Sequence, residues 1–326
     1  MSSTNSRRPI YSYVLCFLAL FTFGASCAQA QAYPSKTIEW ISHSSAGSGT
    51  DLFNRNVSGM LEKEKILNVP FIHTNRVGGN GVIAYQYLKN RKGDPHVVMA
   101  MSVTVILTQS ILPDTGLALD SITPIIRFAQ DPQVVAVRTE SKFKTYQELI
   151  NAAREGNVVA GITGPTGSGR AALHYIERDT GAKFKYVTFK GGGDAVLATL
   201  GGHVDVTTEN MSEMLPLVEA RKMRILAVTG ERRFKQVPEV PTLKELGYKT
   251  VVATGRGFGM APGVPKEAAA TIEKALKHVY DSQAYKDYAD RNMFEDAYLN
   301  SADFAKALVA QRAEQLEFLK AIGIVK

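Results

Sequence analysis

The sequence predicts an α/β protein built as a two-lobed clamshell, and three observations lead to that prediction. Segments with strand alternation and segments with helical spacing follow one another along most of the chain, which is typical of largely parallel sheets. This βα series stops and then restarts near residue 145. Two extended crossings, near residues 127–137 and 250–260, separate the series. If both crossings join the same lobes, each lobe is a mostly parallel sheet flanked by helices, with a hinge and a ligand cleft between the lobes.

The first thirty residues have the order of a secretory signal peptide. Two arginines precede a short apolar run, Val14–Phe23, and Ala28-Gln29-Ala30 forms an A-x-A cleavage site. The run is too short to span a bilayer, and no later segment is apolar over the roughly 18 residues that a membrane helix needs. We expect residues 1–30 to be removed near Ala30 and the mature chain to reach the periplasm. A lipoprotein attached through Cys27 is the alternative, although Gly24 stands where a lipobox usually has leucine.

The composition argues against several classes of function. Both cysteines, Cys16 and Cys27, precede the expected cleavage point, so we expect neither a disulfide nor thiol chemistry. The whole-chain charge of +7 includes the two leader arginines, which leaves +5 on the mature chain. These charges are spread along the chain and not clustered with aromatic residues, so we expect no nucleic-acid partner. The six histidines do not pair at metal-ligand spacing, which argues against a metal site.

The first βα series occupies the region that follows the leader. The segment His96–Met101 (HVVMAM) is continuously apolar, which is typical of a strand buried on both faces. Asn75–Gly81 (NRVGGNG) is rich in turn residues and therefore predicts a loop. Strands are expected at Lys36–Ser42, Val69–His73 and His96–Met101, and helices at Asp51–Lys65 and Val82–Lys89.

The second series lies between the two crossings. Ile122–Arg138 predicts two strands around a break at Asp131-Pro132, and Thr250–Met260 predicts one extended strand with glycine breaks. Between them, helices are expected at Thr145–Glu155, Ser168–Thr180, up to Leu200 and at Ser212–Arg221, and strands at Val158–Ile162, Tyr186–Phe189, Val204–Thr208 and Ile225–Thr229.

The tail of the chain predicts helices only. They are expected at Glu267–Asp281, Ala284–Asn292 and Ser301–Ile322, with Ser301 as the N-cap of the last. If both crossings join the same lobes, this tail returns to the first lobe. We therefore assign residues 31–130 and 255–326 to lobe 1 and residues 131–254 to lobe 2.

Three loops share one design, because each follows a strand, is rich in Gly and hydroxyl residues, and opens a helix. Helix N-termini have unpaired N–H groups and a partial positive charge, and glycine lets the backbone approach a ligand. Such loops at strand carboxyl ends predict a cradle for a carboxylate or phosphate. The alternative is that the glycines only turn the chain and the hydroxyls only cap helices. The loops are Ser42–Asp51 (SHSSAGSGTD), Gly164–Ser168 (GPTGS) and Lys190–Asp194 (KGGGD).

Catalytic motifs are scarce. Neither a G-x-S-x-G elbow nor a G-x-x-x-x-G-K-[ST] loop occurs, which argues against a serine hydrolase and a P-loop nucleotide site. Gly167–Ala172 (GSGRAA) matches G-x-G-x-x-A after a strand, and Asp194 follows about twenty residues later, as a dinucleotide site requires. Against that alternative, the motif lies in mid-chain of an exported protein. We therefore expect no enzyme, no cofactor and no metal.

Short motifs occur in a fixed order from Tyr33 to the C-terminus, and together they identify a resemblance. They are Tyr33-Pro34-Ser35-Lys36, Gly49-Thr50-Asp51, Asn75-Arg76 with Gly78-Gly79-Asn80-Gly81, Gly167-Ser168-Gly169 with His174, Tyr186 with Lys190-Gly191-Gly192, Gly201-Gly202-His203-Val204-Asp205, Val237–Thr242 (VPEVPT) and Ala261–Pro265 (APGVP). In this series the chain resembles the Bug receptors, the solute-binding proteins of tripartite tricarboxylate transporters. The resemblance makes the mid-chain glycine motif a ligand loop and not a nucleotide site.

The resemblance implies a periplasmic-binding-protein fold of type II. It implies a receptor that captures a small organic carboxylate, which is a di- or tricarboxylate, an acidic amino acid or an aromatic acid. Inner-membrane transporter subunits are the implied partners, and a monomer is expected because such receptors open and dock. A ligand-sensing module for a signalling partner and a periplasmic enzyme acting on an organic acid are the alternatives.

The resemblance also implies which residues bind the ligand. In lobe 1 they are Ser44, Ser45, Gly47, Ser48, Thr50 and Asp51 of the first loop, with Asn75, Ser102 and Thr104 beside them. In lobe 2 they are Thr166, Gly167, Ser168, Lys190, Asp194 and Asn210.

Two positions depart from the family pattern. His43 and three serines stand in the first loop where the family usually has two prolines, so His43 is a further candidate. Arg256 stands near the second crossing where the family commonly has an aromatic residue. Its guanidinium would hold a second carboxylate of the ligand. The alternative is that Arg256 caps the hinge from the surface.

Overall fold

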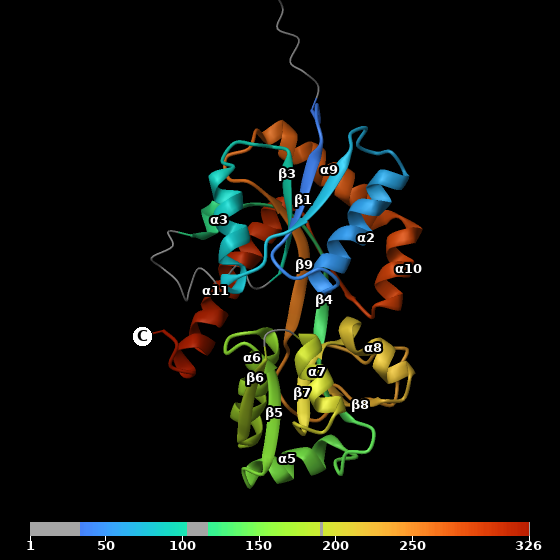
Figure 1. The fold of residues 1–326 in the computed structure, drawn as a ribbon, viewed down its shortest axis with the longest axis vertical. Helices are drawn as coiled ribbons and strands as arrows, with labels where there is room; N and C mark the ends of the chain where they lie inside the picture. Colours follow the sequence, from blue (N-terminus) through green and yellow to red (C-terminus); the bar gives the residue numbers. More distant parts are fainter. Residues whose placement is uncertain (1–32, 103–116, 190–191, 326) are drawn as a thin grey trace, which may run out of the picture.

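The structure is a computed structural model that describes residues 33–102, 117–189 and 192–325. Figure 1 shows two lobes along the long axis of the molecule, with β4 and β9 passing between them. The strands are β1 Ile38–Ser42, β2 Phe71–Asn75, β3 Val97–Met101, β4 Thr123–Arg138, β5 Val158–Thr163, β6 Phe184–Phe189, β7 Val206–Asn210, β8 Met223–Val228, β9 Ala253–Met260 and β10 Glu295–Leu299. The helices are α2 Gly49–Lys63, η2 Gly79–Gly81, α3 Val82–Asn90, η4 Leu119–Ser121, α5 Tyr146–Arg154, α6 Ser168–Thr180, α7 Gly192–Leu200, α8 Met211–Glu219, α9 Lys266–Asp281, α10 Gln283–Arg291 and α11 Ser301–Ala321.

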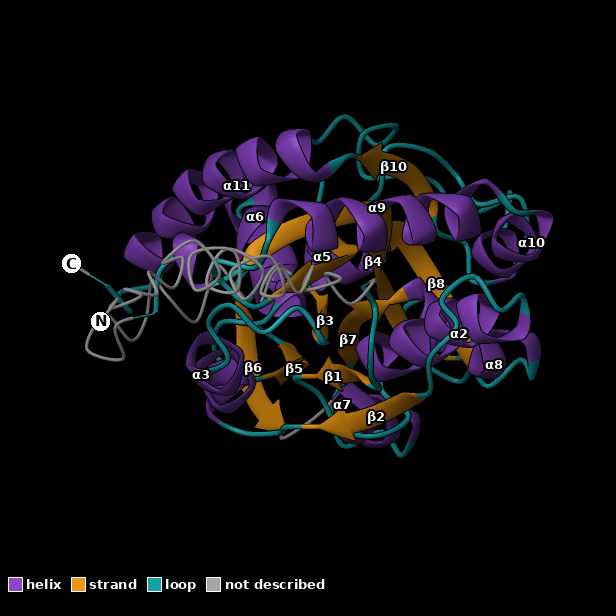
Figure 2. Ribbon diagram, turned by 90° about the horizontal axis from the view of Figure 1, so that it is seen from above, coloured by secondary structure: helices purple, strands orange, loops and turns teal. Residues whose placement is uncertain are grey.

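The upper lobe of Figure 1, which contains β1, β2, β3, β9 and the first part of β4, is a mixed sheet with helices on both faces. Its strands follow the order β2-β1-β3-β9-β4; β1 is parallel to β2 and β3, and β9 is antiparallel to β3 and β4. Helices α2, α9 and α10 bury one face, where the rings of Trp40, Phe53, Phe128 and Phe258 pack together. Helices α3 and α11 bury the other face, and the view from above separates the two layers (Figure 2).

The lower lobe repeats this design on the other end of β4. Its strands follow the order β4-β7-β5-β6, with β5 parallel to β6 and β7, and β8 antiparallel to β4. Helices α5 and α6 bury one face through residues such as Leu149 and Leu173, and α7 and α8 bury the other through Val196 and Met214. The predicted α/β fold with helices around each sheet is therefore confirmed.

Strand β4 corrects one expectation. The sequence predicts a break at Asp131-Pro132, but the structure has a single strand through both residues. Pro132 is the last residue that pairs with β9, opposite Ala253, and Gln133 is the first that pairs with β7, opposite Asn210. A proline has no N–H to give a neighbouring strand, so the position where β4 exchanges partners tolerates it. The same strand thus belongs to both sheets.

The tail differs from its prediction in three ways. Strand β10, which the sequence analysis missed, pairs antiparallel with β4. The N-cap of α11 is Asn300, whose side chain accepts from the Asp303 N–H, while Ser301 lies inside the helix. Helix α11 also reaches the lower lobe: Phe304 packs in the upper core, whereas Phe318 packs on Ala171 of α6. No helix in the described part of the chain is long and apolar enough to cross a membrane.

Candidate functional site

The first glycine-rich loop joins β1 to α2 and is held by Asp51. The Asp51 carboxylate accepts from the Gly47 N–H at 2.9 Å, from Arg55 at 3.0 Å and from the Asn75 amide at 2.8 Å. Burial would raise the pKa of Asp51, but these donors lower it below its usual value. Gly47 has a φ of +80°, which L side chains rarely adopt. Asp51 therefore shapes the loop from behind and is occupied by the protein itself.

Serine hydroxyls line the inner side of this loop. The Ser48 hydroxyl donates to the Ser44 hydroxyl at 2.6 Å, and Ser44 lies 3.0 Å from the Ser42 hydroxyl. Ser48 is the N-cap of α2, yet its side chain makes no capping hydrogen bond. The N-terminal amides of α2 are thus left for another acceptor.

That acceptor comes from the other lobe. Glu213 lies in the first turn of α8 and accepts from the Gly49 backbone amide; burial raises the pKa of Glu213, and the Arg256 guanidinium and this amide oppose that rise. A Cβ atom at Gly49 would stand 2.6 Å from Glu213 Oε1 and 2.8 Å from the Arg256 guanidinium. Glycine is therefore required at position 49, because a lower-lobe carboxyl group and a buried guanidinium fill the space at the start of α2.

A buried ion pair lies at the junction of the lobes. Arg256 of β9 donates to Asp131 of β4 through Nε at 3.2 Å and through its terminal nitrogen at 2.5 Å. The guanidinium also donates to Thr50 Oγ1 at 3.1 Å, and Ser212 donates to Asp131 at 2.7 Å. Burial raises the pKa of Asp131, and Arg256 opposes that rise. Arg256 and Asp131 are 2% and 0% exposed, so this pair is shielded from water.

The second glycine loop joins β5 to α6 in the lower lobe. Its N-cap, Gly167, has no side chain to cap the α6 amides. A Cβ at Gly169 would stand 2.2 Å from the Thr208 carbonyl oxygen, so this glycine allows α6 to approach β7. Thr254 of β9 donates to Ser168 at 3.4 Å and accepts from Asn210 at 3.1 Å. The loop is thereby tied to the hinge strands.

A second buried carboxyl group lies beside Glu213. Glu209 is the last residue but one of β7 and accepts from Thr163 at 2.7 Å. A Cβ at Gly192 would stand 2.8 Å from Glu209 Oε2 and 3.1 Å from Glu213 Oε2. Burial and the neighbouring Glu213 raise the pKa of Glu209 to about 8. Glu209 is therefore protonated at neutral pH, which reduces repulsion between the two groups.

His43 lies on the upper-lobe side of the loop. Its Nε2 is 2.9 Å from the Ser102 hydroxyl, and its ring stacks near Tyr85 with centroids 6.2 Å apart. Burial, and then the positive charge of Arg256, lower the pKa of His43 to about 4. The imidazole is neutral at neutral pH and acts as a hydrogen-bonding group.

The structure brings most of the predicted residues to the junction of the lobes. Ser44, Ser48, Thr50, Asp51 and Asn75 belong to one hydrogen-bonded region around the first loop and the start of α2. The remaining predicted residues differ in how exposed they are: Thr166, Ser102 and Asn210 are buried, Gly167 and Ser168 are partly buried, and Ser45, Gly47 and Asp194 are exposed. Two more predicted residues, Thr104 and Lys190, lie outside the described residues.

Sequence reasoning missed four polar residues at this junction: Asp131, Glu209, Glu213 and Thr254. Glu209 lies one residue before the end of a strand whose burial is continuous, and Glu213 follows three residues after the N-cap Asn210. A charged residue at the end of an otherwise buried strand was the one available signal. Arg256 was found, but its partner Asp131 was assigned to a strand break.

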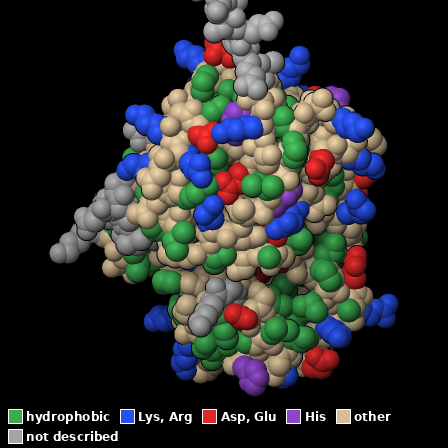
Figure 3. Space-filling model, turned by 45° about the horizontal axis from the view of Figure 1, so that its top comes forward, with side chains coloured by type: hydrophobic (Ala, Val, Ile, Leu, Met, Phe, Trp, Pro, Cys, Tyr) green, Lys and Arg blue, Asp and Glu red, His purple; other side chains and the backbone are tan. Residues whose placement is uncertain are grey.

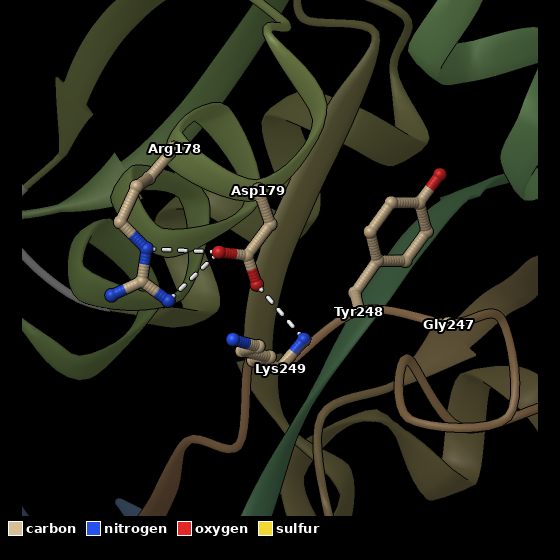
Figure 4. Close-up of a pocket in the computed structure, with 5 residues that line it drawn as sticks. All are labelled: Arg178, Asp179, Gly247, Tyr248 and Lys249. Atoms are coloured by element: carbon tan, nitrogen blue, oxygen red, sulfur yellow. Dashed lines mark hydrogen bonds and ion pairs between the residues drawn. The ribbon is translucent and has the colours of Figure 1, made fainter.

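A pocket of the lower lobe also contains charged side chains. Figure 4 shows Asp179 accepting there from Arg178 and from the Lys249 N–H. Asp179 also accepts from the Thr250 hydroxyl. The Asp179 carboxylate is thus used to tie α6 to the segment before β9. On the face in Figure 3, basic and acidic side chains are intermingled over the upper lobe. Among the described residues, no group of His, Cys, Asp and Glu could hold a metal ion.

Comparison with known proteins shows which families share this architecture. The family described as "Tripartite tricarboxylate transporter family receptor" matches residues 55–324. The UPF0065 protein in the gbd 5' region of Cupriavidus necator is 26% identical over 92% of this chain and 91% of its own. Protein BugT of Bordetella pertussis is 26% identical over 83% of this chain and 85% of its own.

Solved structures agree with the fold. A TctC solute binding protein from Polaromonas superposes with a TM-score of 0.69 at 28% identity, covering 89% of this chain and 99% of its own. Rpa4515 of R. palustris, solved with adipate, gives a TM-score of 0.82 at 21% identity, covering 89% of this chain and 98% of its own.

Proposed function

Because this chain belongs to the family of tripartite tricarboxylate transporter receptors, which includes the TctC and Bug proteins, we propose that it captures a small organic carboxylate in the periplasm. The acid would then pass to the membrane subunits of a transporter. Candidates are the di- and tricarboxylates, acidic amino acids and aromatic acids. The solved relative that holds adipate supports the carboxylate class.

The arrangement of α6 and the first loop carries this proposal. The α6 N-terminus has a glycine N-cap and therefore no side-chain acceptor for its amides, and the first loop contributes the hydroxyl groups of Ser44 and Ser48. Unpaired amides at a helix N-terminus favour an anion. We propose that Ser44, Ser48, Gly167 and Ser168 contact the bound carboxylate, with Ser45, Gly47, Thr166, Asn75, Ser102, Thr104, Lys190, Asp194 and Asn210 around it.

Three further residues have a supporting role in this proposal. Asp51 holds the first loop, Arg256 holds Thr50 of α2, and His43 holds Ser102. All three spend their polar atoms on protein partners. They would preserve the shape of the cleft without contacting the ligand.

A thermal-shift screen of mono-, di- and tricarboxylates, aromatic acids included, tests the proposal. A ligand that binds only the folded state stabilises it by about 2.7 kcal/mol at a hundredfold excess over Kd, so the matching acid should raise Tm by several degrees. Sugars and simple cations at the same ionic strength serve as controls. If sugars or cations raise Tm and no carboxylate does, the proposal is wrong.

A further inference from the structure

We propose that Glu213 determines the selectivity of this cleft: by filling the start of α2, it makes the site a monocarboxylate site that excludes a second carboxylate of the ligand. This inference rests on the proposed function and narrows its ligand class. Glu213 belongs to α8 of the lower lobe, and the position that it fills is the N-terminus of α2 in the upper lobe.

The first argument is occupancy. Helix α2 would be a second natural anion position in the cleft, since its N-cap Ser48 gives it no side-chain cap. Glu213 Oε1 stands only 2.6 Å from the position that a Cβ of Gly49 would take. This leaves no room for a carboxylate of the ligand at the start of α2. A ligand carboxylate at this position would have to displace Glu213.

The second argument concerns the neighbouring cation. Arg256 is the cation of the described residues closest to this position, and its terminal nitrogen stands 2.8 Å from the same Gly49 Cβ point. Its donors are engaged by Asp131 and Thr50, and the side chain is 2% exposed. Arg256 also attracts the Glu213 carboxyl group, which opposes the rise that burial gives its pKa. The cation is therefore already shared between Asp131 and Glu213, and a second carboxylate of the ligand would have to compete with both.

The third argument is that Glu213 is held in place. Asn210, the N-cap of α8, donates to the Asp131 carbonyl oxygen at 2.7 Å, and Ser212 donates to the Asp131 carboxylate at 2.7 Å. The start of α8 is thus fixed to β4 through two residues that come just before Glu213. On its other side stands Glu209, which adds a further acidic group and no cation. The first turn of α8 therefore presents Glu213 to α2 as a fixed group.

Three matched pairs of acids test the inference: pentanoate with glutarate, hexanoate with adipate, and 4-methylbenzoate with terephthalate. Members of a pair share a carbon skeleton and differ in the second carboxylate. Wild-type protein should bind the monocarboxylate of at least one pair about tenfold more tightly by calorimetry, because the second carboxylate meets Glu213. The Glu213→Ala variant should move that ratio by about tenfold or more toward the dicarboxylate.

The matched control is Glu219→Ala, which makes the same change at the exposed end of the same helix and should keep the wild-type ratio. A wild-type preference for the dicarboxylate overturns the inference without any variant, so the test does not depend on the stability of Glu213→Ala. An unchanged ratio in a folded Glu213→Ala protein overturns it as well. If none of the six acids binds while the thermal-shift screen finds another carboxylate, the inference is overturned and the proposed function stands; if that screen finds no carboxylate either, both are overturned.

Discussion

The Arg256–Asp131 pair shows how single residues set the hinge region. Both side chains are withdrawn from water, and Arg256 also holds Thr50 at the start of α2. A buried ion pair contributes little net stability by itself, but removing one partner leaves a buried charge without compensation. The pair is therefore expected to be sensitive to substitution of either member.

Arg256→Ala should lower the free energy of unfolding by about 3 kcal/mol, since it leaves the Asp131 carboxylate buried without its cation. Urea denaturation followed by circular dichroism measures the change. Lys306→Ala is the control: it removes an exposed pair with Asp303 and should change stability by less than about 1 kcal/mol. Equal effects of the two variants would contradict the assigned role of Arg256.

Glu209 gives the hinge region a pH dependence. Its pKa is raised from 4.5 to about 8 by burial and by Glu213, so the folded state keeps a proton that the unfolded state loses. Below about pH 4.5 this carboxyl group does not reduce the free energy of unfolding. As the pH rises toward 8, the unfolded state loses its proton first, and the free energy of unfolding falls. Glutamine has no such proton to lose.

Glu209→Gln should therefore match wild type near pH 4.5 and become more stable than wild type at pH 8, by on the order of 4 kcal/mol. Urea unfolding at several pH values gives the difference curve. Glu219→Gln, at an exposed position on α8, should give a flat curve. A flat curve for Glu209→Gln would mean that Glu209 is ionised in the folded state.

At the scale of elements, α11 is more than a cover for the upper sheet. Its first half packs Phe304 and Leu308 into the upper core. Its last turns pack Phe318 against α6 of the lower lobe, with ring centroids 5.4 Å from His174 and 6.2 Å from Tyr175. The N-terminus of α6 carries Gly167 and Ser168. Helix α11 thus links the upper lobe to the helix that we propose holds the anion.

Phe318→Ala should lower the free energy of unfolding by about 3 kcal/mol, because the ring is 1% exposed and leaves a cavity between α11 and α6. Hydrogen exchange should also quicken in α6. Val309→Ala, at a site on the same helix that is 62% exposed, should leave both measurements near wild type. Unchanged exchange in α6 would show that α11 does not steady that helix.

At the scale of the whole molecule, β4 and β9 decide how the lobes meet. Strand β4 pairs with β9 up to Pro132 and with β7 from Gln133, so the change of sheet falls within two adjacent residues. This change supports the proposed division into residues 31–130 with 255–326 and residues 131–254. The return of α11 to the lower lobe adds a contact that this division does not describe. Movement between lobes must bend the two strands and shift α11 on α6.

The sequence by itself determined the alternation of strands and helices, the position of the glycine-rich loops and the α/β class. These properties depend on neighbours within a few residues, so periodicity and turn chemistry are sufficient to predict them. Strand β10 was not predicted, because its pairing with β4 and not its own pattern defines it.

Only the tertiary structure decided which side chains meet at the junction of the lobes. Asp131 and Arg256 are 125 residues apart in sequence and become partners through the register of β4 and β9. Glu213 reaches Gly49 only because α8 and α2 approach from different lobes. Such contacts follow from the packing of whole lobes, for which no local pattern in the chain gives a signal.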